Sequence, residues 1–75
     1  MENTKDQQSA RLAALEAERA ALSEREDFER AVYARATGAE SWRAYADYLA
    51  ASDAVDAWDA KHGAEMDALI AAIEH

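Results

Sequence analysis

Hydrophobic positions recur at helical spacing along the chain, and the first of them predict a long helix. Leu12, Leu15 and Leu22 project within about 80° of one another when successive residues turn by 100°. These three leucines, the leucine seam, predict a helix from about residue 9 to residue 36 that docks along one face. Residues 1–8 are polar, and we expect them to be frayed.

The leucine seam stops at Ser23, and two alternatives follow for the rest of the first helix. Phe28 and Val32 lie on nearly the opposite side of the helical wheel, so a straight helix would have to change its packing partner. A break is the other alternative, because Ser23 and Glu26 have the spacing of a capping box. The straight helix would carry exposed ion pairs at short spacing, namely Glu16 with Arg19, Glu26 with Arg30 and Asp27 with Arg30.

A second helix is predicted from Glu40 to His62, after Thr37-Gly38, where glycine can adopt a left-handed C-cap. It carries two apolar stripes, and two stripes on one helix require two packing partners. One stripe holds Trp42, Tyr45, Ala46 and Leu49, and the other holds Tyr48, Val55, Trp58 and His62. Ser52-Asp53 could interrupt the helix, because both residues favour N-caps.

A third helix is predicted from about Ala64 to Glu74, after a stop at His62-Gly63. Its apolar residues share one face and predict firm packing; they are Met66, Leu69, Ile70 and Ile73. Few β-branched residues and no hairpin turn occur, so strands are not expected. The sequence therefore predicts one all-α domain over residues 1–75, a small antiparallel bundle of three or four helices with a long first helix.

Composition indicates a thin hydrophobic core. Hydrophobic residues make up 51% of the chain, but 21 of the 75 residues are alanine and only 10 are Leu, Ile, Val or Phe. Partial disorder is one interpretation; the one we favour is a helical protein that completes its core against a second copy, because alanine favours helices and proline is absent. We expect the bulky aromatics Trp42, Trp58, Tyr45 and Phe28 to fill that core.

Charge narrows the range of partners. Sixteen acidic and eight basic residues give a net charge of −8, which argues against nucleic acid or an anionic membrane as a direct partner. Residues 44–75 alone carry seven acids and one base. No apolar run is long enough to span a bilayer, and cysteine is absent, so we expect a cytoplasmic protein of a bacterial host cell.

The acidic residues of the second helix are the main candidate for a binding site. Asp53, Asp56 and Asp59 follow one another at steps of three residues, about 4.5 Å along a helix, against about 3.4 Å per phosphate of a DNA strand. Together with Asp47 they could occupy a basic groove that normally holds nucleic acid, with Tyr48 or Trp58 as an apolar anchor. The alternative is that these carboxylates only keep a small protein soluble.

Catalytic and metal sites are not expected. Each serine lies where a helix cap would be, and no glycine-rich or strand-turn-helix context could build an oxyanion hole, so we predict no enzymatic activity. Asp59, His62 and Glu65 are spaced by three residues, but Gly63 would break a helix between them, and we favour a structural or solvent-facing histidine. We therefore predict neither a metal nor another cofactor.

One short segment resembles a known family. Tyr45-Ala46-Asp47-Tyr48-Leu49, followed by an alanine- and acid-rich helix, is similar to a segment of the small acidic anti-CRISPR proteins carried by phages. The resemblance covers about a third of the chain and implies an acidic helix, as in DNA mimics, that faces the basic channel of a surveillance complex. Only Asp47 is a matching acid within the segment, and this sequence predicts no strands.

Two functions follow as hypotheses. The first is a non-enzymatic inhibitor, encoded by a phage or mobile element, whose acidic helix face occupies the basic nucleic-acid-binding surface of a defence or DNA-handling complex. The alternative is a homodimeric helical adaptor or regulatory module in which the leucine seam or an aromatic stripe forms the dimer interface and the acids only solvate it.

Overall fold

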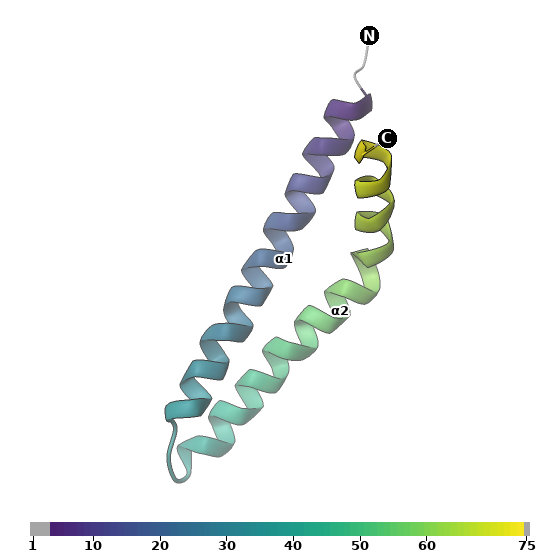
Figure 1. Cartoon of the computed structure of the whole chain (residues 1–75). Helices are drawn as coiled ribbons and strands as arrows, with labels where there is room; N and C mark the ends of the chain where they lie inside the picture. The colour runs from purple at the N-terminus through teal and green to yellow at the C-terminus, as the bar shows by residue number, and fades with distance from the viewer. Residues whose placement is uncertain (1–3, 75) are drawn as a thin grey trace.

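Two long helices make up almost all of the chain. The computed structural model describes residues 4–74, with α1 at Thr4–Arg35 and α2 at Glu40–Glu74. The helices run antiparallel and side by side as a hairpin (Figure 1). The all-α prediction is confirmed, whereas the prediction of three or four helices is not. The predicted stop at His62-Gly63 and the possible breaks at Ser23 and Ser52-Asp53 all lie inside helices.

The predicted turn at Thr37-Gly38 is confirmed. α1 ends at Arg35, and residues 36–39 connect it to α2. The Ala36 amide donates to the Tyr33 carbonyl and the Ser41 amide donates to the Gly38 carbonyl, each at 3.1 Å. Gly38 has a φ of 60°, the left-handed conformation that a residue without Cβ adopts at little cost.

α1 continues straight through Ser23, so the capping-box break is not present. The seam continues beyond Leu22 through polar residues, since Glu26 is half-buried and Glu29 is buried. Phe28 is 63% exposed, which makes its predicted place in the core wrong. α1 also begins at Thr4, so the fraying expected over residues 1–8 does not extend to residues 4–8; residues 1–3 lie outside the described residues.

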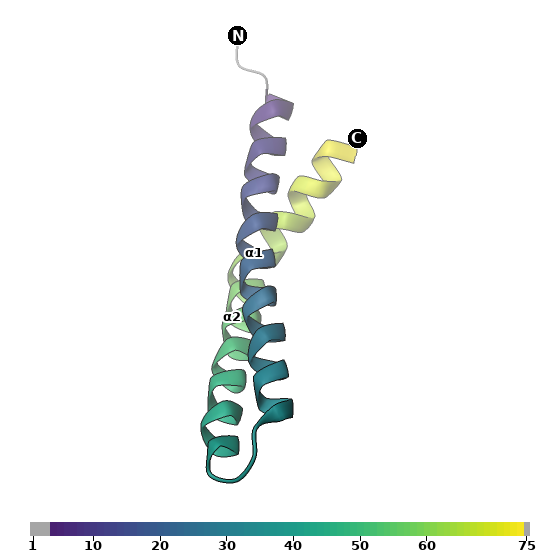
Figure 2. The same cartoon turned by 90° about the vertical axis from the view of Figure 1, so that its left-hand side faces the viewer.

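α2 runs unbroken through Ser52-Asp53 and through Gly63, where the third helix was expected to begin. A glycine inside a helix lowers its stability, but does not by itself end it. α2 instead changes direction in its yellow-green part, and the segment that follows runs at an angle to α1 (Figure 2). Beyond Gly63, Met66, Leu69 and Ile73 are half-buried and Ile70 is exposed, so the firm packing predicted for this face is not seen.

The core between the two helices is small. Leu15 is fully buried, and it is joined from α2 by Ala44, Ala51, Val55 and Trp58. The core position predicted for Trp58 is confirmed. The same prediction for Trp42 is wrong, because its side chain is 79% exposed.

The hairpin is a rod rather than a compact bundle. Its principal extents are 61 × 17 × 16 Å. Among the described residues, neither helix has a window apolar enough to cross a membrane.

Candidate protein-binding surface

Two acidic residues of α2 are held by arginines of α1. Arg19 donates two hydrogen bonds to Asp59, at 2.8 and 3.0 Å, and Arg11 donates two to Glu65, at 2.8 and 3.1 Å. These hydrogen bonds lower the pKa of the Asp59 and Glu65 carboxyls below their usual values. Both side chains remain about two-fifths exposed, but their charge is already neutralised within the chain.

Asp53 and Asp56 are different, because their carboxylates are exposed and unpaired. Neither forms a hydrogen bond or an ion pair within residues 4–74. They lie about 4.5 Å apart along the axis and about 60° apart around it. Asp67, further along α2, is also exposed without a partner in that part of the chain. Asp53 and Asp56 therefore form a small fixed patch of uncompensated negative charge.

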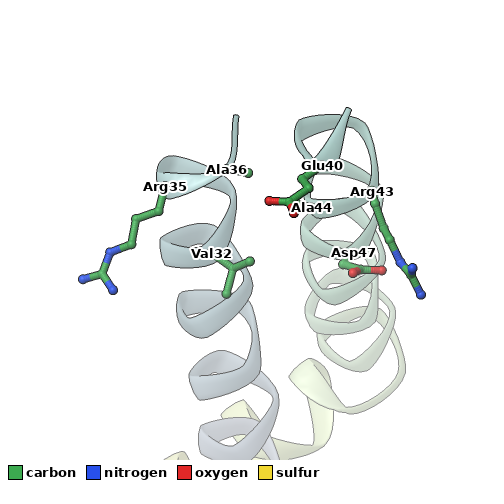
Figure 3. Close-up of a pocket in the computed structure, with 7 residues that line it drawn as sticks. All are labelled: Val32, Arg35, Ala36, Glu40, Arg43, Ala44 and Asp47. Carbon is green, nitrogen blue, oxygen red and sulfur yellow. The ribbon is translucent and has the colours of Figure 1, made fainter. Parts of the chain in front are cut away.

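Asp47 lies on another side of α2, about 120° from Asp53. It borders an open hollow of about 520 Å³ near the turn, which is also lined by Val32 of α1 and by Ala36 of the connection (Figure 3). In this view the Glu40 carboxylate points into the gap between the helices, while the guanidinium groups of Arg35 and Arg43 point outward. The four predicted aspartates are thus spread over three sides of the helix.

The two predicted apolar anchors are already engaged within the hairpin. Tyr48 stacks on Tyr33 with ring centroids 6.3 Å apart, and the Arg30 guanidinium lies 5.7 Å above its ring. Trp58 is 8% exposed and contacts His62, with ring centroids 4.9 Å apart. Its Nε1 is buried without a hydrogen-bond acceptor in the described residues. Neither ring offers a free face comparable to that of Trp42.

The exposed apolar surface of α2 is formed by the other stripe. Trp42 is 79% exposed, Tyr45 40% and Leu49 41%. We call these three residues the Trp42 stripe. Trp42 and Leu49 share a sector of about 60° with Asp53 and Asp56, so apolar and acidic groups follow one another along the outer side of α2. The sequence predicted both apolar stripes of this helix, but it did not predict which of the two α1 would cover.

The described residues do not bring together the elements of a metal site. No group of three His, Cys, Asp or Glu side chains in residues 4–74 is arranged to hold a metal ion. Asp59 and Glu65 face arginines instead, and His62 Nδ1 lies 3.8 Å from Glu65 Oε1.

Comparison of the chain with protein-family models, curated proteins and solved structures finds no significant match.

Proposed function

We propose that this chain is a non-enzymatic inhibitor that binds another protein through the acidic outer side of α2. The partner we propose is the basic nucleic-acid-binding surface of a defence or DNA-handling complex, as the resemblance to the anti-CRISPR proteins of phages implies. The observation that supports this function is the contrast between Asp53 and Asp56, which are unpaired, and Asp59, which Arg19 neutralises.

The helix holds the two carboxylates of Asp53 and Asp56 close together, which favours binding to a basic surface. Asp53 and Asp56 repel each other in the free chain, and the helical backbone keeps them from moving apart. Arg43 and Lys61, the two basic residues of α2, lie about 110° from the middle of the acidic sector and do not offset it. A partner's lysines and arginines would relieve this repulsion, and the net charge of −8 would speed the encounter.

The test is affinity capture from a bacterial lysate on the immobilised chain, followed by binding measurements with the purified captured protein. We expect Asp53→Lys/Asp56→Lys to weaken binding at least tenfold, and we expect duplex DNA to compete. Binding should also weaken as salt is raised, because salt screens exposed charges.

Glu16→Lys/Glu24→Lys is the matched control, because it makes the same change in net charge on exposed residues of α1. Equal losses for the two double variants would show that total charge, and not the α2 surface, determines binding. Simultaneous binding of DNA and this chain to the partner would overturn the mimic mechanism.

A further inference from the structure

The Trp42 stripe is an apolar surface that the hairpin leaves uncovered. Its aromatic side chains adjoin Tyr33 of α1, whose ring centroid lies 5.2 Å from that of Tyr45. Tyr33, Ser41, Trp42 and Tyr45 also line a hollow of about 180 Å³ beside the stripe. An exposed tryptophan next to a hollow of this size offers both a protruding group and a recess for an opposing side chain.

The chain exposes more surface to solvent than a compact protein of the same mass would expose. The chain exposes 5587 Å². A compact protein of 8.2 kDa is expected to expose about 4,500 Å². The excess is on the order of 1,000 Å², close to the roughly 800 Å² that each partner buries in a standard protein interface. This excess is spread along the whole rod, and a second copy packed alongside α2 would cover part of it.

We propose that a second copy of this chain covers the Trp42 stripe, with α2 of one copy antiparallel to α2 of the other. A two-fold axis between Tyr45 and Ala46 would place each Trp42 opposite Leu49 of the second copy. The interface would then be self-complementary, with two equivalent Trp42–Leu49 contacts and the Tyr45 rings near its centre.

Charge selects the antiparallel orientation. In a parallel pair, Asp53 and Asp56 would lie beside the same residues of the second copy. None of these four carboxylates has a cationic partner among residues 4–74 of its own chain to offset the repulsion. In the antiparallel pair the two Asp53 residues lie about 20 Å apart along the axis, beyond the Debye length of about 8 Å.

The same register leaves the acidic patch open. Asp53 lies opposite residue 38 of the second copy, which precedes the start of α2 at Glu40. Asp53 and Asp56 therefore extend beyond the paired segment. The dimer does not depend on the proposed inhibitor function, and the two can be tested separately.

Analytical ultracentrifugation of the purified chain tests the dimer. We expect a mass of twice 8.2 kDa at micromolar concentration. Trp42→Ala and Leu49→Glu should each weaken dimerisation at least tenfold, with helix content confirmed by circular dichroism. Phe28→Ala is the matched control, because Phe28 is 63% exposed on α1 and lies outside the stripe. A wild-type monomer at 100 μM, or equal weakening by Phe28→Ala, would overturn the proposal.

A distance measurement tests the orientation. The chain has no cysteine, so Asp56→Cys provides a single site for a spin label in each copy. The antiparallel register predicts about 30 Å along the axis between the two labels. A distance below about 20 Å would show a parallel pair instead. Asp53→Lys/Asp56→Lys should leave the dimer intact, so loss of inhibitor function in that variant would be distinct from loss of the dimer.

Discussion

At the residue scale, the two glycines of this chain have opposite roles. Gly38 forms the turn with a φ of 60°, where a Cβ would be strained whatever space surrounds it. Gly63 lies within α2, and a Cβ built there would meet no atom within 4 Å. The first glycine is required by backbone conformation, whereas the second only weakens a helix that forms without a break.

Alanine substitutions should therefore change stability in opposite directions. Gly63→Ala should raise the free energy of unfolding by about 0.5–1 kcal/mol, because alanine has less backbone freedom to lose. Gly38→Ala should lower it by about 1–2 kcal/mol. Urea unfolding followed by circular dichroism, at one protein concentration, measures both. Destabilisation by Gly63→Ala would mean that the bend of α2 requires glycine.

At the element scale, contacts of different kinds hold the two helices together along the rod. Near the turn the contact is aromatic, between Tyr33 and Tyr45. Further along it is apolar around Leu15, and the bidentate pairs of Arg19 with Asp59 and Arg11 with Glu65 accompany it. Arg11 and Arg19 lie about one turn before and one turn after Leu15, so the two ion pairs flank the most deeply buried residue of the small core.

The Asp59–Arg19 pair should make stability depend on pH in a defined range. The folded-state pKa of Asp59 is lowered by Arg19, below the unfolded value of about 3.9. The stabilisation is therefore complete well above that value and is lost as pH falls through the folded-state pKa. The free energy of unfolding of the wild type should exceed that of Asp59→Asn at pH 7, and this difference should shrink toward zero as pH falls through the folded-state pKa of Asp59.

Asp56→Asn provides the control for this measurement, because it removes one carboxylate that has no arginine partner in the described chain. Urea titrations of the three proteins across the pH range give the comparison. If Asp56→Asn and Asp59→Asn lower the free energy of unfolding equally at pH 7, the ion pair of Asp59 with Arg19 makes no specific contribution to stability.

The sequence predicted the helical class and the turn correctly, but it did not predict how the helices pair. Leu15, Leu22 and Glu29 are seven residues apart and share one side of α1, so helix geometry buries Glu29 and exposes its neighbour Phe28. Sequence reasoning looked for an apolar residue to continue the seam, and therefore left a break at Ser23 open as an alternative to a straight helix. Local patterns likewise could not distinguish Asp59 from Asp53, because the arginine that pairs with Asp59 is 40 residues away in sequence.

At the scale of the whole molecule, the chain has much surface for its mass. Its radius of gyration is 16.8 Å, against about 11 Å for a compact domain of this length. Few side chains are buried, and the net charge of −8 adds self-repulsion. Association with a second copy should therefore stabilise this hairpin more than it would stabilise a compact domain of the same length.

Thermal stability should accordingly depend on protein concentration. Association of folded chains stabilises them by mass action, so the Tm of the wild type should rise between 1 and 100 μM. The Tm of Trp42→Ala should stay nearly constant over the same range. Melting curves recorded by circular dichroism measure both, and a constant wild-type Tm would argue against association of the folded chain.

The contrast between Trp58, 8% exposed, and Trp42, 79% exposed, also provides two intrinsic optical reporters. In the monomer, a water-soluble collisional quencher should reach the Trp42 indole and leave the Trp58 indole largely unaffected. Emission from Trp58 would then follow unfolding, and protection of Trp42 from the quencher would follow occupation of the outer side of α2, without any attached dye.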